Sequence, residues 1–177
     1  MANLADRMIR AAKLDVSLYE EVEADQGAMG QATAVVVLSS VAAGVGAFAH
    51  VGVGGIVIGT IVALVGWYVW AFLTYLIGTK LLPEPQTRAD MGEMLRTIGF
   101  STSPGVIRVL GIISPLADIV HVVAAIWMLV AMVIAVRQAL DYRGTWRAVG
   151  VCVIGWSVYV LVAGILLSML GRNAPPA

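Results

Sequence analysis

Long apolar runs are the feature that most restricts how this chain can fold. Residues 30–49, 52–78, 119–137 and 148–170 each approach the roughly 20 apolar residues that a helix needs to cross a membrane. The 177 residues are 60% hydrophobic and 12% charged, and the mean hydropathy is +0.91. An ordinary soluble domain is about 45–50% apolar and about 25% charged. The sequence therefore predicts an all-α, multi-pass membrane protein.

A fifth apolar run, residues 104–117, is too short to be assigned from its length. As an α-helix it reaches only roughly 20 Å, whereas the hydrocarbon core is roughly 30 Å thick. Lys and Arg collect on the cytoplasmic side of membrane proteins. If all five runs cross, nine basic residues lie on that side and only Arg172 on the other. We therefore expect five transmembrane helices over 30–171, with a cytoplasmic N-terminus and an external tail, 172–177.

Two polar segments have the pattern of helices that lie along the cytoplasmic face. Within residues 1–29, apolar and basic positions over 3–19 predict an amphipathic helix on the membrane surface, followed by an acidic linker. Over residues 87–99, apolar residues recur at helical spacing, and Thr87 with Asp90 resembles a capping box. We expect this second segment to be a short interfacial helix that leads into the third span.

The stretch GFSTSP, residues 99–104, interrupts the apolar pattern before the third span. Ser103 can cap a helix, and Pro104 suits the first turn, where a missing N–H costs nothing. Arg108 follows about 6 Å into that helix. One interpretation is structural: the guanidinium returns to the cytoplasmic headgroups or pairs with Glu93, Asp141 or the acidic residues before the first span. The other places it on a polar substrate pathway, because charges inside membranes often serve a function.

Gly99 and Phe100, followed by Pro104, resemble the Gly-aromatic-x-x-x-Pro signature that opens the third helix of Yip1-domain membrane proteins. Residues 14–32 and 126–142 are similar to bacterial members of that family. The resemblance covers most of the chain and implies five helices with a cytosolic N-terminus. Eukaryotic relatives act in early secretory trafficking and bind Rab-type GTPases. This chain lacks their Asp-Leu-Tyr-Gly-Pro motif, so that role is not expected here.

Small residues recur on one side of two predicted helices, where they would let helix backbones approach closely. One interpretation is packing within a single bundle, and the other is a dimer seam or a docking face for another subunit. The positions are Gly52, Gly55, Gly59 and Gly66 in the second helix, and Gly150, Ser157 and Gly164 in the last.

Acidic residues precede the first span, and the link after the fourth span is basic. The acidic residues form either a solvated linker or, by pairing with the arginines of that link or with Arg96, part of an ion-pair network that closes the cytoplasmic face. A divalent-ion site is a third, weaker alternative. The residues of the network are Glu20, Glu21, Glu23, Asp25, Arg137, Asp141, Arg143 and Arg147.

His50, Asp118 and His121 fall at the non-cytoplasmic end of the predicted helices. Histidine and carboxylate side chains bind zinc-like ions. These three residues come from two separate links, however, and their spacing is not that of a metal motif. Asp118 is also suited to cap the fourth helix, so both interpretations remain open.

The sequence contains no catalytic triad, haem pair, Walker loop or dinucleotide fingerprint. Zero net charge indicates no nucleic-acid surface, and we expect neither enzyme activity nor a cofactor. We predict a bacterial inner-membrane protein of Yip1 type that is a scaffold or accessory subunit and organises the bilayer. Its partners would be membrane lipids, a second copy or another membrane protein. The competing hypothesis is a small transporter, channel or lipid scramblase, assembled as an oligomer.

Overall fold

The chain folds into helices joined by short links. The computed structural model describes residues 3–172, except for the side chains at 163, 164 and 166–172, and this part contains no strand. The α-helices are α1 (Leu4–Ala12), α2 (Val16–Ala24), α3 (Met29–Gly46), α4 (Phe48–Leu76), α5 (Met91–Ser101), α6 (Ala117–Ala139) and α7 (Thr145–Arg172). The shorter turns are η1 (Gln26–Ala28), the π-helical η2 (Ile77–Leu81), and the 3-10 helices η3 (Ser103–Ile112) and η4 (Ser114–Leu116).

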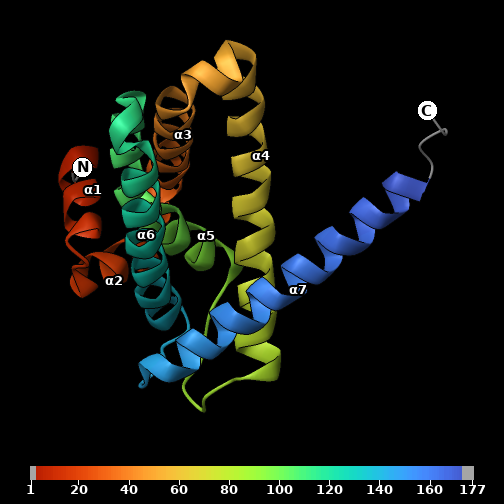
Figure 1. Cartoon of the computed structure of the whole chain (residues 1–177). Coiled ribbons are helices and arrows are strands. Elements are labelled where there is room, and N and C mark those ends of the chain that lie inside the picture. Colours follow the sequence, from red (N-terminus) through yellow and green to blue (C-terminus); the bar gives the residue numbers. More distant parts are fainter. Residues whose placement is uncertain (1–2, 173–177) are drawn as a thin grey trace.

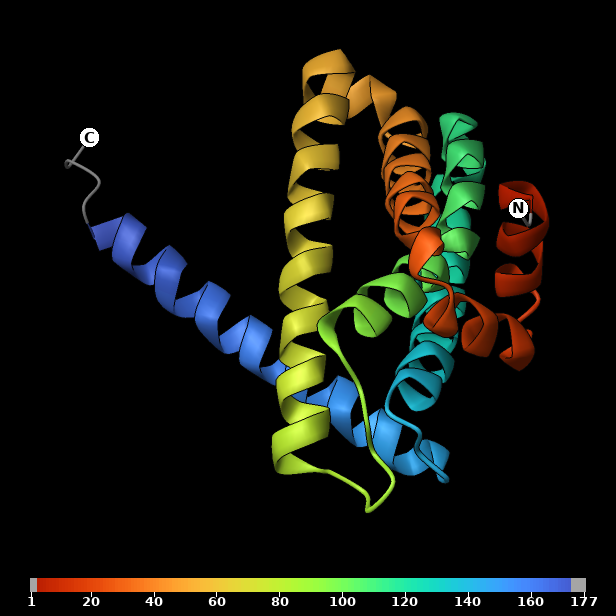
Figure 2. The same ribbon diagram turned by 180° about the vertical axis from the view of Figure 1, so that it is seen from behind.

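Four helical segments of the described chain are long and apolar enough to cross a membrane. They are Gln26–Gly46, Phe48–Leu81, Ser114–Ala139 and Thr145–Val162. Figures 1 and 2 show α3, α4 and α6 standing side by side, with α1 and α2 against the outer side of α6. α7 crosses the lower end of α4 obliquely and then runs away from the other helices.

The third predicted span is a 3-10 helix, η3, and not an α-helix. Its ten residues reach about 20 Å at about 2.0 Å per residue, and it is not among the four long apolar segments. η3 packs between α3 and α6. Its backbone approaches α3 so closely that a Cβ added at Gly46 would collide with the carbonyl oxygen of Arg108. We attribute the narrow helix to this tight fit.

The start of η3 differs in detail from the prediction. Thr102 is its N-cap residue and makes no side-chain cap. The Ser103 hydroxyl donates instead to the Phe100 carbonyl oxygen at 2.7 Å, so Ser103 is not a cap. Pro104 does occupy the first turn.

The two basic links lie at the same end of the molecule. Arg147 Nε is 3.1 Å from Glu84 Oε1, and Gln86 Nε2 donates to the Asp141 carbonyl oxygen at 3.1 Å. Between Glu84 and Asp141, the chain therefore runs to the opposite end of the molecule along η3 and returns along α6. This arrangement is what five crossings require, although the number of crossings stays a prediction.

α5 is a buried helix, although its sequence predicts one on the membrane surface. Every residue from Met94 to Ser101 is buried, because α2, α3, α4 and α6 pack around it. The capping box is formed by Asp90 and Glu93, so the helix begins at Met91. The Thr87 hydroxyl accepts from Glu84 N at 2.9 Å and belongs to the preceding turn.

The N-terminal segment forms two helices where one amphipathic helix and a linker are predicted. Leu14 has a φ of 62°, which ends α1, and Asp15 caps α2 by accepting from Ser17 N at 3.0 Å. The acidic residues therefore lie on α2 and in the turn that follows it. α1 packs against α6, where Trp127 Nε1 donates to the Ala12 carbonyl oxygen at 2.7 Å.

Candidate functional site

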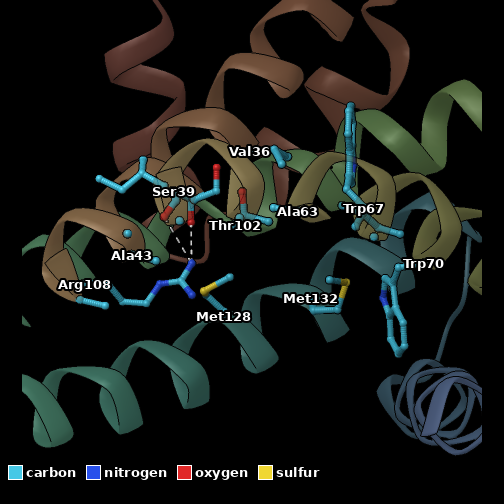
Figure 3. A pocket seen from close by; sticks show the side chains of 18 of the residues that line it. Val36, Ser39, Ala43, Ala63, Trp67, Trp70, Thr102, Arg108, Met128 and Met132 are labelled. Atoms are coloured by element: carbon cyan, nitrogen blue, oxygen red, sulfur yellow. Dashed lines mark hydrogen bonds between the residues drawn. The ribbon is translucent and has the colours of Figure 1, made fainter. Parts of the chain in front are cut away.

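A cavity of about 600 Å³ lies between α3, α4, α6 and η3. Figure 3 shows Arg108, Ser39 and Met128 at one end of it and Trp67 and Trp70 at the other. Its other lining residues are Val36, Ser40, Ala43, Gly44, Ala47, Val51, Gly55, Ile56, Gly59, Ala63, Gly66, Ile98, Thr102, Met132, Trp156 and Tyr159. The lining therefore holds one cation, four hydroxyl groups and no carboxylate.

Arg108 is held by neutral oxygen atoms. Its Nη2 lies 3.0 Å from Ser39 Oγ and 3.5 Å from the Ser39 carbonyl oxygen, and its Nε donates to the Gly105 carbonyl oxygen at 3.1 Å. Within the described residues it forms no ion pair, so neither Glu93 nor Asp141 is its partner. These hydrogen bonds offset part of the roughly 2.5–3.5 kcal/mol that an arginine costs at the centre of a membrane helix.

The position of Ser39 shows how deep the Arg108 guanidinium lies. Ser39 is ten residues after Met29, the first residue of α3, which is about 15 Å along the helix axis. The guanidinium turns toward this midpoint and into the cavity. The geometry therefore favours a half-buried charge that faces a cavity over one that returns to the cytoplasmic headgroups.

Gly99, Phe100 and Pro104, which resemble a family signature, each have an identifiable structural role. A Cβ added at Gly99 would lie 2.9 Å from the Ala32 Cβ, so this glycine lets α5 approach α3. Phe100 is fully buried between α2, α3 and α6. Pro104 is buried in the first turn of η3. Together these residues turn the chain from α5 into η3 and direct Arg108 toward α3.

Comparison with protein families agrees with this signature, since the Yip1 domain matches residues 18–169. The chain belongs to the Yip1 family. No curated protein and no solved structure matches it significantly. Yip1 proteins are membrane proteins and are not known as enzymes, and the apolar helices of this chain fit a membrane protein.

The acidic residues of this Yip1 domain pair with the N-terminal helix. Arg7 Nη2 is 2.8 Å from both Glu21 and Asp25, and Arg10 Nη1 is 2.6 Å from Glu21. The sequence predicts a solvated linker or pairs with the arginines of the 137–147 link or Arg96, and it does not predict Arg7 and Arg10 as the partners. The Asp15-x-Ser17 cap, which marks a second helix folding back on α1, was the available signal.

The remaining members of the predicted network, except Arg147, which pairs with Glu84, meet around a second cavity of about 500 Å³ on the face of the basic links. Its charged lining residues are Glu20, Glu23, Glu93, Arg137, Asp141 and Arg143. They are not joined into one network: Glu20 accepts from Gln138 at 2.9 Å, and Arg137 donates to Thr145 at 3.4 Å. Burial, helped by the charges of Asp141, Glu93 and Glu20, raises the pKa of Glu23 to about 7.

The predicted small-residue stripe of α4 makes few contacts within the chain. A Cβ added at Gly59 or Gly66 would meet nothing within 4 Å, and one at Gly55 would meet only Val51. Gly52 has a φ of 59° and forms a kink. Three of these glycines, at 55, 59 and 66, line the 600 Å³ cavity instead.

The small residues of α7 also make few contacts with the other helices. A Cβ added at Gly150 would touch only Leu82, at 3.6 Å. The exposed Ser157 hydroxyl donates to the Val153 carbonyl oxygen of its own helix. Gly164 lies outside the residues whose side-chain surroundings are described. The closest backbone approach is at Gly46, where an added Cβ would collide with the Arg108 carbonyl oxygen, and the stripe pattern did not single out this residue.

The two histidines and Asp118 line one cavity of about 440 Å³ at the end opposite the basic links. In the described residues, no three His, Cys, Asp or Glu side chains are grouped so that they could hold a metal ion. Asp118 is not a cap either: Leu116 is the N-cap residue of α6, and Asp118 lies in its first turn. The structure thus places His50, Asp118 and His121 around one cavity, but not close enough to one another to hold a single metal ion.

Proposed function

We propose that this Yip1 protein is a non-catalytic accessory or scaffold protein of the bacterial inner membrane that binds another membrane subunit along α7. The observation that carries the proposal is the course of α7. A Cβ added at Gly155 would lie 3.4 Å from the Trp70 ring, so α7 packs against α4 there, whereas no described side chain beyond Gly155 is buried. From Trp156 to Val162, the described side chains of this apolar helix are exposed or half-buried.

The chemistry of α7 supports a protein partner for this distal part. Helices associate in membranes through close packing at small residues, because the lipid provides no hydrophobic driving force. Gly150, Ser157 and Gly164 recur every seven residues and so lie along one side of the helix. Ser157 is exposed and is flanked by the exposed Trp156 and Tyr159. A partner helix could therefore approach closely at Ser157 and pack against two aromatic rings.

Photo-crosslinking in the native membrane tests this proposal. A crosslinking amino acid at position 157 should capture one recurrent polypeptide, identified by mass spectrometry after purification in mild detergent. The matched control is position 62 of α4, where Val62 is 62% exposed and apolar. Ser157→Leu should abolish co-purification of the partner. Lipid adducts alone at both positions would contradict the docking role.

Lipid or ion transport is a second candidate function, and the placement of Arg108 favours it. A pathway through a membrane needs polar groups along it, and Arg108, Ser39, Ser40 and Thr102 supply these groups on one cavity. The test is reconstitution into vesicles. Movement of lipid or ion that is lost in Arg108→Ala would favour transport over the scaffold role, whereas absence of any movement would reject transport.

A further inference from the structure

We propose that the 600 Å³ cavity binds one anionic phospholipid, whose phosphate is held by Arg108 and Ser39 and whose acyl chain lies against the small-residue wall of α4. This wall consists of Gly55, Gly59, Ala63 and Gly66. The proposed lipid site is distinct from the docking role of α7, although Trp156 and Tyr159 of α7 also line this cavity.

The charge of the cavity identifies the headgroup chemistry. Arg108 contributes a positive charge, and its Nη1 has no acceptor among the described residues. A guanidinium offers paired N–H donors that match the oxygen atoms of a phosphate. The lining has no carboxylate to receive an ammonium group. The site should therefore prefer phosphatidylglycerol to phosphatidylethanolamine.

Gly105 makes room for the two residues that would hold the phosphate. A methyl group at this position would lie 2.7 Å from Arg108 Nη2 and 2.8 Å from the Met128 sulfur, and would collide with Ser39 Oγ. Glycine therefore allows the guanidinium and the hydroxyl to meet. Because the Ser39 oxygen accepts from Arg108, its own proton can turn toward a phosphate oxygen.

The wall of α4 fits an acyl chain. From Gly55 to Gly66 the helix advances about 16 Å, and its four wall residues carry no side chain larger than a methyl group. Cβ atoms added at Gly59 and Gly66 would still meet nothing within 4 Å. Trp67, Trp70 and Met132 complete an apolar lining beyond Arg108. The cavity thus combines one polar end with a long apolar wall.

The size and charge of the cavity favour a lipid over the helix of a partner protein. A cavity of about 600 Å³ is in the range of about 300–1,000 Å³ that holds small molecules. A transmembrane helix is about 10 Å wide and about 30 Å long, which is far larger. It would also have to bring its own carboxylate into the membrane to pair with Arg108. A phospholipid supplies the negative charge together with the apolar chain.

Native mass spectrometry of the full chain in mild detergent tests the site. Phosphatidylglycerol, phosphatidylethanolamine and inorganic phosphate would be added separately. The wild type should retain one phosphatidylglycerol with at least about tenfold preference over the other two probes, equivalent to about 1.4 kcal/mol. Arg108→Gln should lose this preference. Arg143→Gln, at an exposed arginine outside the cavity, should keep it.

A second pair of variants keeps the proposal falsifiable if Arg108→Gln does not fold. Gly59→Leu places a side chain in the acyl groove without touching Arg108, and should reduce phosphatidylglycerol binding at least about tenfold. Gly54→Leu, on the same helix but outside the lining, should not. Equal lipid binding by all variants would overturn the proposal. Binding of inorganic phosphate as strong as that of the lipid would also overturn it, since the α4 wall would then contribute nothing.

Discussion

Arg7 has only 4% of its surface exposed, although it belongs to a segment whose composition predicts a surface helix. Its guanidinium contacts Glu21 and Asp25, and its Nη1 donates to Gln31 Oε1 at 3.0 Å. A buried arginine is tolerated because these groups satisfy its donors. Arg7 thereby joins α1, the end of α2 and the start of α3.

Replacing Arg7 by Ala should lower the free energy of unfolding by about 1–3 kcal/mol, because Asp25 loses its partner and Glu21 keeps only Arg10. The measurement is thermal unfolding in detergent. Arg143→Ala provides the control: this side chain is exposed and only its backbone N–H bonds to Glu84. We expect the control to change stability by less than about 0.5 kcal/mol. Equal effects of the two variants would contradict the Arg7 network.

Glu23 should make stability depend on pH. Its pKa in the folded chain is about 7, above the ordinary value of 4.5, so between these values the folded chain holds a proton that the unfolded chain releases. The free energy of unfolding should therefore fall as pH rises from about 4.5 to about 7. Glu23→Gln should flatten this decline in a series of Tm measurements. Asp6→Asn, at an exposed position on α1, should leave the decline unchanged.

At the scale of elements, the fit of α5 against α3 depends on Gly99. Gly99→Ala should destabilise the fold by about 1–3 kcal/mol, because its methyl group would press on Ala32. Adding Ala32→Gly should recover part of that loss, as thermal unfolding of the single and double variants would show. Gly54→Ala is the matched control, since its methyl group would meet nothing within 4 Å. No recovery in the double variant would mean that Gly99 acts in another way.

The long apolar helices are the elements that the sequence predicts best. Their apolar runs are long, and the predicted 119–137, for example, lies within Ala117–Ala139. Segment 104–117 is the exception: composition does not distinguish a 3-10 helix from an α-helix. The predicted start of α5 is wrong because two residues in the sequence could serve as its N-cap. Thr87 and Asp90 both suit a capping role, and only the Glu93 contact selects Asp90.

At the scale of the molecule, the shared position of the two basic links gives a direct test of topology. In a Cys152→Ala background, single cysteines at Arg88 and Gly144 should react with a membrane-impermeant thiol reagent from the same side. A cysteine at Ala49 should react only from the opposite side. All three positions are exposed. Labelling of Arg88→Cys and Gly144→Cys from opposite sides would contradict the five crossings.

The candidate site illustrates the limit of prediction at this scale. Arg108 stands out in the sequence because it is a charge within an apolar run, and Gly55, Gly59 and Gly66 stand out as a stripe. Nothing in the sequence shows that they line one cavity. Ser39, the Arg108 partner, is an unremarkable hydroxyl 69 residues earlier. Pairings over such distances depend on how helices pack, and local patterns do not encode them.

The contacts of the N-terminal helices impose an order on biosynthesis. The Ala12 carbonyl oxygen accepts from Trp127, and the Val22 carbonyl oxygen accepts from Arg96 Nε at 2.9 Å. Ribosomes make the N-terminus first, yet these partners are synthesised 74 to 115 residues later. The pairs that Arg7 makes with Glu21 and Asp25 can form early, because they are local. α1 and α2 must therefore wait, folded on each other, until α5 and α6 reach the membrane and close the bundle against them.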